Sequence, residues 1–193
     1  QFVATAINGT GLQVMTSPDG INWTLRSTPA TGQWANVRYG NGIWVTTSAD
    51  GLSTTNQVMT SPDGINWTAH DSSVVCDFFG LEYGKGLFIA SGTDCLMTSP
   101  DGVTWTTRTV PSGSSHQWHA IKYGDGLFVS VSKTGTERAM YSYDGITWTA
   151  ASTPNTNAYH DVTFGNGMFV AAANSGTGNR IMTSGNMRSY DVT

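Results

Sequence analysis

The chain has few charged residues, and the basic ones are in the minority. Charged side chains make up 11% of its 193 residues, with 9 lysines and arginines against 13 aspartates and glutamates. The basic residues are scattered singly, whereas a nucleic-acid surface needs clustered lysine and arginine. No apolar run approaches the ~20 residues that a membrane-spanning helix requires. We therefore expect no nucleic-acid partner and no membrane insertion.

Cysteine is almost absent, since Cys76 and Cys95 are the only two. Neither has a histidine at metal-ligand spacing, so a zinc site is disfavoured, and we expect no metal and no cofactor. A single disulfide in an exported protein is the better interpretation. It requires the loops that carry the two residues to lean together, because a disulfide needs Cα atoms within about 7 Å.

Glycine, by contrast, is abundant with 23 residues, and much of it belongs to repeated phrases. One phrase occurs four times, as SPDGINWT (17–24), SPDGINWT (61–68), SPDGVTWT (99–106) and SYDGITWT (142–149). A second phrase alternates with it, as in WANVRYGNGIWVTTS (34–48) and YHDVTFGNGMFVAAA (159–173). Each period of roughly 40–45 residues holds four short β-like runs, which is the pattern of a β-propeller.

The repeats predict one all-β domain, a five-bladed β-propeller with four-stranded antiparallel blades and one terminal blade incomplete. The single domain spans 1–193, and its blades span about 1–28, 33–70, 77–109, 117–151 and 158–193. Within each blade, glycine-flanked turns such as YGNG join the first two strands, because tight hairpins need residues with positive φ.

The two ends of the chain leave the closure of the ring open. The last residues, DVT (191–193), copy 161–163, but the short link after Met182 favours the fourth strand of blade 5 over a first strand for blade 1. Blade 1 is then three-stranded, or its first strand lies upstream of Gln1. Because the chain opens without an initiator methionine, we expect that a leader, a preceding domain or added sequence was removed, and a fragment of a longer propeller is an alternative.

The octapeptide has a structural interpretation as an S-x-D-G-x-x-W turn. Its aspartate can accept hydrogen bonds from backbone N–H groups of the same turn, its glycine supplies positive φ, and its tryptophan is an apolar plug. The residues assigned this structural role are Ser17, Asp19, Trp23, Ser61, Asp63, Trp67, Ser99, Asp101, Trp105, Ser142, Asp144 and Trp148.

These turns resemble the Asp-box (BNR-type) repeat of sialidase-like propellers, in a form one residue shorter between aspartate and tryptophan. The resemblance covers essentially the whole chain. It implies a propeller whose boxes lie away from any active site, and it extends to hydrolases, lectins and assembly factors alike. The arginine triad of sialidases is not recognisable, because Arg26 and Arg108 share one repeat position on different blades.

The loops on the rim opposite the boxes vary between repeats, and loops on a rigid scaffold commonly carry function. An aromatic residue opens the first strand of each complete blade on this rim, with polar residues beside it. Aromatic faces stack on sugar rings, while amides and carboxylates bind hydroxyls. The candidate ligand-binding residues are Trp34, Trp118, Tyr159, His119, His160, Asp161 and Gln117. Alternatively, aromatics at one fixed repeat position form the core between blades.

Catalysis is disfavoured, because no G-x-S-x-G elbow occurs and no acid/base pair can be named. Glu82 in particular is expected on the opposite face of its strand from the position that Asp161 occupies. We expect an extracellular lectin-like module, secreted or surface-displayed, that binds carbohydrate or a glycoconjugate through the variable rim. The alternatives are a self-associating building block of a surface fibre, filament or phage tail, or an adhesin, and secondly a glycoside hydrolase.

Overall fold

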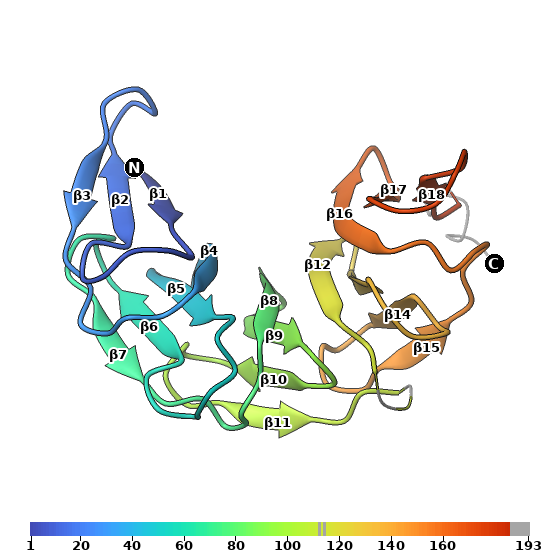
Figure 1. The fold of residues 1–193 in the computed structure, drawn as a ribbon, viewed down its shortest axis with the longest axis horizontal. Helices are drawn as coiled ribbons and strands as arrows, with labels where there is room; N and C mark the ends of the chain where they lie inside the picture. The colour runs from blue at the N-terminus through green and yellow to red at the C-terminus, as the bar shows by residue number, and fades with distance from the viewer. Residues whose placement is uncertain (112, 114, 186–193) are drawn as a thin grey trace.

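The computed structural model describes residues 1–111, 113 and 115–185, and every regular element in this part of the chain is a β-strand. Eighteen strands form five antiparallel sheets. Among these residues there is no helix long and apolar enough to cross a membrane. The predicted all-β class is confirmed, and Figure 1 shows the five sheets arranged in turn around a common centre, as the blades of a propeller.

The three middle blades have four strands each, and the first and last have three. Blade 1 consists of β1 (Phe2–Thr5), β2 (Val14–Ser17) and β3 (Thr24–Arg26). Blade 2 consists of β4 (Trp34–Gly40), β5 (Ile43–Ser48), β6 (Val58–Ser61) and β7 (Thr68–His70). Blade 3 consists of β8 (Phe78–Gly84), β9 (Leu87–Gly92), β10 (Leu96–Ser99) and β11 (Thr106–Arg108). Blade 4 consists of β12 (Trp118–Gly124), β13 (Leu127–Ser132), β14 (Ala139–Ser142) and β15 (Thr149–Ala151), and blade 5 of β16 (Tyr159–Gly165), β17 (Met168–Ala173) and β18 (Ile181–Thr183).

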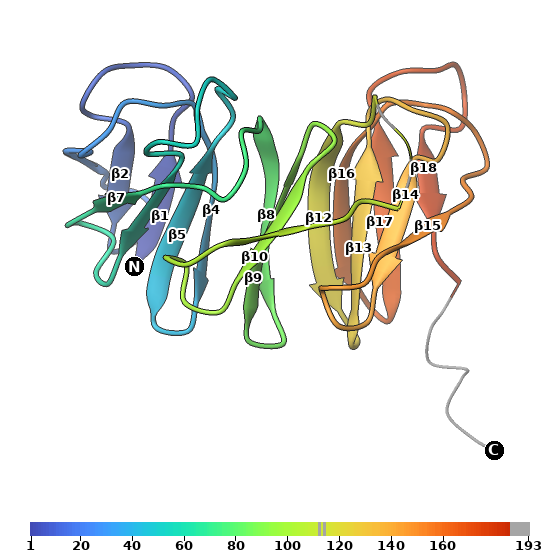
Figure 2. The ribbon, with the colours of Figure 1, turned by 90° about the horizontal axis from the view of Figure 1, so that it is seen from below.

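The first two strands of blades 2 to 5 are joined by two-residue turns whose sequence dictates their shape. Both residues of each turn have positive φ, as at Asn41 (φ 47°) and Gly42 (φ 81°). Such turns match the twist of the strands they join, and glycine and asparagine tolerate them at little cost. The predicted hairpin geometry is confirmed, and Figure 2 shows the β4–β5 and β8–β9 turns on the same edge of the molecule.

The S-x-D-G-x-x-W turns join the third and fourth strands and are held by the aspartate side chain. In blade 3, Asp101 Oδ1 accepts hydrogen bonds from the backbone N–H groups of Val103 (2.9 Å) and Thr104 (2.7 Å). The Ser99 hydroxyl donates to the same oxygen (2.9 Å). The same set of bonds surrounds Asp19, Asp63 and Asp144. The hydrogen bonds predicted for the turn are thus present in all four copies.

The tryptophan of each turn lies over its own glycine, and in blades 2 to 4 it also packs against the preceding blade. Trp105 Nε1 donates to the carbonyl oxygen of Gly102 (3.0 Å). Its ring belongs to a buried cluster that includes Val45 and Val58 of blade 2. This tryptophan is buried in blades 2 to 4, whereas Trp23 of blade 1 is 41% exposed. The plug therefore acts between blades as well as within the turn.

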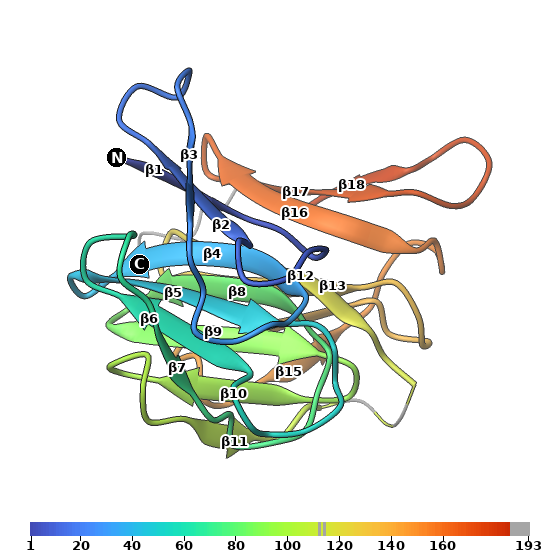
Figure 3. The same cartoon turned by 60° about the vertical axis from the view of Figure 1, so that its left-hand side comes forward.

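The five blades form an arc that is open between blade 1 and blade 5 (Figure 1). The inner strands β4, β8, β12 and β16 each pack against the next, and Figure 3 shows the β4–β7 sheet layered on the β8–β11 sheet. Within the described residues, no extensive packing joins the β1–β3 sheet to the β16–β18 sheet. Blade 1 has three described strands, as expected. The predicted fourth strand of blade 5 falls on 186–193, outside the described residues.

The turn aspartates predict a loss of stability in acid. Backbone hydrogen bonds from Thr147 and Ile146 lower the pKa of Asp144 to about 2, and equivalent bonds lower the pKa of Asp19, Asp63 and Asp101. A carboxylate with a lowered folded-state pKa contributes stability above its ordinary pKa near 4 and loses it as the pH falls through the folded value. We therefore expect the melting temperature to fall between about pH 4 and pH 2.

Thermal unfolding followed by circular dichroism across this pH range measures the loss. A variant with asparagine at all four positions keeps an acceptor oxygen in each turn but cannot titrate there. Its melting temperature, although lower at neutral pH, should depend less on pH in this window. Equal acid sensitivity in both proteins would show that other groups cause the loss.

Candidate functional site

The inner strands bring polar side chains together around the centre of the arc. β4, β8, β12 and β16 each carry an irregularity in pairing after their first residue, and the residues that follow face the centre. They line a cavity of about 190 Å³. Its side chains of chemical interest are Asn36, Arg38, Phe79, His119, His160 and Asp161. We refer to this site as the central cavity.

The most distinctive feature of the central cavity is a pair of histidines from neighbouring blades. The ring centroids of His119 and His160 are 3.8 Å apart, and Phe79 stacks on the other side of His119 at 5.1 Å. His119 Nδ1 lies 3.0 Å from the carbonyl oxygen of His160, so Nδ1 carries the proton and donates it. Nε2 of His119 is then left as a hydrogen-bond acceptor.

Burial keeps this imidazole neutral. Desolvation, followed by the repulsion of His160, lowers the pKa of His119 to about 4. At neutral pH the ring therefore carries no charge. Its Nε2 can accept a hydrogen bond from a ligand hydroxyl, but the ring is a weak base.

Asp161 and Asn36 add a carboxylate and an amide to the same cavity. Asp161 is exposed, and its Oδ1 accepts a hydrogen bond from the backbone N–H of Val162 (2.8 Å). Asn36 Nδ2 donates to the carbonyl oxygen of Phe79 (3.0 Å), and its Oδ1 accepts from the Thr47 hydroxyl (3.1 Å). Asn36 is thus fixed by the scaffold, whereas the carboxylate of Asp161 keeps acceptor capacity for a ligand.

An ion-pair network at the inner strands was not predicted. Glu82 is nearly buried, and its Oε2 lies 3.3 Å from Arg38 Nε and 3.2 Å from Lys122 Nζ. The expectation that Glu82 points to the other face of the sheet from Asp161 is wrong. Glu82 stands two residues after Gly80, the repeat equivalent of Asp161, and strand residues two apart share a face. The three charged residues occupy the same repeat position, which is the signal that could have revealed them.

The aromatic residues that open the inner strands lie elsewhere. Trp34, Trp118 and Tyr159 are fully buried between blades, so no face of these rings is available to a sugar. Their positions are those of the inter-blade core that the sequence left open as the alternative. Gln117 does not line the central cavity, and its carbonyl oxygen accepts from the Ser132 hydroxyl (3.0 Å). Of the candidate binding residues, the structure brings together only His119, His160 and Asp161.

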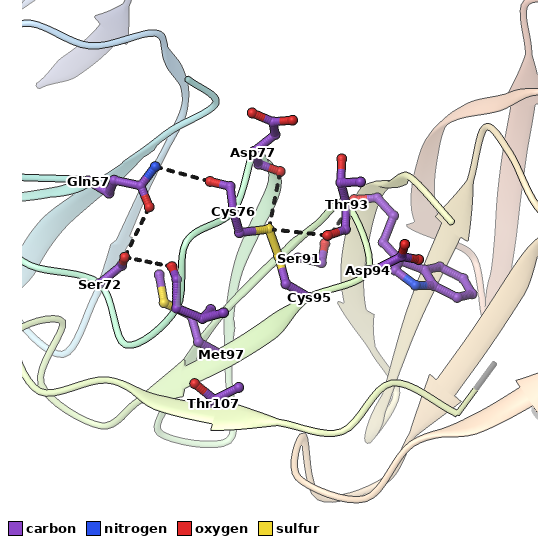
Figure 4. Close-up of a disulfide and its surroundings, with 12 residues drawn as sticks. Gln57, Ser72, Cys76, Asp77, Ser91, Thr93, Asp94, Cys95, Met97 and Thr107 are labelled. Atoms are coloured by element: carbon purple, nitrogen blue, oxygen red, sulfur yellow. Dashed lines mark hydrogen bonds between the residues drawn. A yellow bond between two sulfur atoms is a disulfide. The ribbon is translucent and has the colours of Figure 1, made fainter. Parts of the chain in front are cut away.

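A disulfide joins two loops on the variable rim (Figure 4). The Cα atoms of Cys76 and Cys95 are 6.4 Å apart. The Cys76 carbonyl oxygen accepts a hydrogen bond from Gln57 Nε2 (3.1 Å), and Gln57 Oε1 accepts from the Ser72 hydroxyl (3.0 Å). The bridge therefore fixes a loop of blade 3 against the adjoining loops of blade 2.

A second, apolar cavity of about 360 Å³ lies between blades 4 and 5. Aliphatic residues such as Leu127, Val129 and Met182 line it. In the other interfaces the S-x-D-G-x-x-W turn reaches the preceding blade, as Gly145 approaches Ile89. Blade 5 has Ser184 and Gly185 where the other repeats have S-P or S-Y, and the residues described up to 185 include no such turn at this place. Within the described residues, no three His, Cys, Asp or Glu side chains gather where they could hold a metal ion.

No family model matches the chain, and no curated protein matches its sequence. Among solved structures it is similar to a catalytically inactive variant of virginiamycin B lyase from Staphylococcus aureus with quinupristin (TM-score 0.75, 10% identity, 94% of this chain and 64% of that one). It is also similar to two computationally designed proteins, Ika4 (0.58, 13%, 80% and 92%) and Ika8 (0.60, 13%, 89% and 55%). The chain thus spans less than two thirds of the length of Ika8 and of this lyase. At such identities these likenesses show the fold alone, and the fold they support is a β-propeller.

Proposed function

We propose that the protein is a non-catalytic carbohydrate-binding module whose site is the central cavity. The observation that carries this proposal is the convergence of His119, His160 and Asp161 on one cavity, from strands of two neighbouring blades. A neutral imidazole and a carboxylate can accept hydrogen bonds from hydroxyl groups. His160, which is exposed, offers a ring face for the C–H side of a sugar.

The same geometry argues for binding over catalysis. A histidine with a pKa of about 4 is a poor general base at neutral pH, because efficient bases have a pKa near the operating pH. Glycoside hydrolysis needs two carboxyl groups about 5–10 Å apart, one of them free to donate a proton. Glu82 is paired with both Arg38 and Lys122 and does not suit that role. The similarity to a lyase therefore identifies no residue of this chain for a catalytic role.

The disulfide and the turns bear on where the protein acts and on which propellers it is related to. The Cys76–Cys95 disulfide supports an extracellular or surface-displayed protein, because disulfides persist in oxidising compartments. The hydrogen bonds around Asp19, Asp63, Asp101 and Asp144 support a relationship to Asp-box propellers, in which the boxes serve the fold. In this proposal the turns serve the fold, and the ligand binds in the central cavity.

A glycan array with the purified protein, followed by calorimetry on any hit, tests the proposed function. We expect Asp161→Asn and His119→Ala to weaken binding roughly tenfold each, because a hydrogen bond to a charged group contributes about 1.5–3 kcal/mol and a neutral one somewhat less. Both substitutions already occur at the same repeat position of blade 2, as Asn36 and Ala35, so the strand should tolerate them. The hydrogen bond that His119 accepts should persist above about pH 5, where this ring remains neutral.

Asp125→Asn is the matched control. It also removes a carboxylate, at a turn position where blades 2 and 5 have Asn41 and Asn166. We expect this variant to bind as the wild type does. A blank array with folded protein, or equal losses in the control and the cavity variants, would contradict carbohydrate binding at this site.

A further inference from the structure

The interfaces between blades 1 and 2, 2 and 3, and 3 and 4 follow one plan, and the interface between blades 4 and 5 shares it except for the turn tryptophan. The blade that comes first in the chain contributes aliphatic residues from its second and third strands, such as Ile43, Val45 and Val58 in blade 2. The next blade covers them with the aromatic residue of its second strand, the methionine of its third strand and the tryptophan of its turn. In blade 3 these are Phe88, Met97 and Trp105. Each blade thus has a leading face with large side chains and a trailing face with aliphatic ones.

The leading face of blade 1 is complete in composition but has no partner among the residues that the structure describes. Phe2, Met15 and Trp23 occupy the repeat positions of Phe88, Met97 and Trp105. Their exposed fractions are 53%, 37% and 41%, against 0%, 0% and 8% for the residues of blade 3. Leu25, which pairs with Met15 in the sheet, is 60% exposed. Exposed apolar side chains that form a contiguous patch mark an interaction surface.

The trailing face of blade 5 is the counterpart at the other end of the arc. Met168, Val170 and Ile181 occupy the repeat positions of Ile43, Val45 and Val58. Ile181 is 58% exposed, whereas Val58 is fully buried. Figure 1 shows this sheet and blade 1 at the two ends of the arc, on either side of the opening. Each end therefore presents the surface that the other end lacks.

We propose that these two faces bind each other between copies of the chain, head to tail. The leading face of blade 1 in one copy packs on the trailing face of blade 5 in the next, and so continues the kind of interface that neighbouring blades form within the chain. A contact between two different faces is heterologous, so it produces a closed ring or an open filament of copies. Within the described part of the chain, blade 1 has no strand equivalent to β8, whose Phe78 and Leu81 add to the internal interface. The intermolecular contact is therefore weaker than the internal ones and depends on concentration.

This proposal is independent of the central cavity, and sedimentation velocity over a wide concentration range tests it. We expect the mass to rise from 20.6 kDa to twice that value or more as concentration increases. Met15→Lys blocks the leading face, and Ile181→Lys blocks the trailing face. Each variant alone should remain a monomer, because a head-to-tail contact needs both faces.

A mixture of the two variants gives the decisive test of head-to-tail association. Met15→Lys keeps an intact trailing face and Ile181→Lys keeps an intact leading face, so an equimolar mixture should form dimers and nothing larger. Leu52→Lys, at an 86% exposed position away from both faces, is the control and should associate as the wild type does. Circular dichroism establishes that each variant is folded. A wild type that stays monomeric at every concentration, association that survives in either variant, or a mixture that stays monomeric would each overturn the proposal.

Discussion

Replacing Trp118 with alanine should lower the free energy of unfolding by about 3–5 kcal/mol, the range for large aromatic residues removed from a core. The ring is fully buried in the interface between blades 3 and 4, in one cluster with Ile89, Leu96 and Met140. His116 stacks on it with ring centroids 5.2 Å apart. Alanine would leave a cavity that the rigid sheets on both sides cannot close. Chemical denaturation followed by circular dichroism measures the loss.

Two comparisons give this result its meaning. Trp118→Phe should cost much less, because it keeps an aromatic ring and because the Trp118 indole N–H has no partner among the described residues. Tyr143→Ala, at a residue that is 67% exposed, should change stability by no more than about 0.5 kcal/mol. A Trp118→Ala protein with unchanged stability would contradict a core role. It would return this residue to the set of candidate sugar-stacking side chains.

The propeller fold was predictable because its decisive interactions are local. Asp101 bonds to residues two and three positions away, and the same spacing recurs at Asp19, Asp63 and Asp144. Turn residues such as Asn41 and Gly42 indicate positive φ, because asparagine and glycine adopt it most readily. A repeat of such short-range signals fixes the strands and their order. It also allowed the three-stranded blade 1 to be anticipated.

The candidate site was predictable only in part. His119, His160 and Asp161 could be found because they depart from the repeat beside an otherwise constant aromatic. The face on which each residue lies was harder to predict, since every inner strand has a pairing irregularity after its first residue. Trp118, which precedes the irregularity, therefore points between the blades. Glu82 lies beyond the irregularity of its own strand, two residues after Gly80, and pairs with Arg38. The Glu82 network was missed because Glu82 was placed one residue after Gly80, whereas aligning the inner strands places it two residues on, at the repeat position of Arg38 and Lys122.

The opening of the arc could not be predicted from the sequence, because it depends on the angles between neighbouring blades. The angle between neighbouring blades depends on the volumes of the side chains packed at each interface, such as Phe78 and Trp118. The period of the repeat does not encode that angle. Five blades can therefore be counted from the sequence, while the opening between blade 1 and blade 5 appears only in three dimensions (Figure 1).

Loss of the Cys76–Cys95 disulfide should lower the free energy of unfolding by about 3 kcal/mol. The bridge joins residues with a sequence separation of 19. Closing a loop of this size lowers the entropy of the unfolded chain and so raises its free energy by about this amount. We expect a Cys76→Ser, Cys95→Ser variant to unfold at a correspondingly lower denaturant concentration. The reductant-treated wild type should match it, and the variant itself should not respond to reductant.

Hydrogen bonds and packing also hold this part of the rim, so a smaller loss of stability is the alternative result. Gln57 bonds to the Cys76 carbonyl oxygen, and the Asp94 carboxylate accepts from the backbone N–H of His116 (2.7 Å). Gly92 leaves no room for a side chain beneath Asp77, so the loop is also packed against its blade. A loss well under 1 kcal/mol would mean that these contacts persist in the reduced protein and in its unfolded ensemble. The full loss would show that the covalent bond, rather than the hydrogen bonds around it, limits the freedom of the unfolded chain.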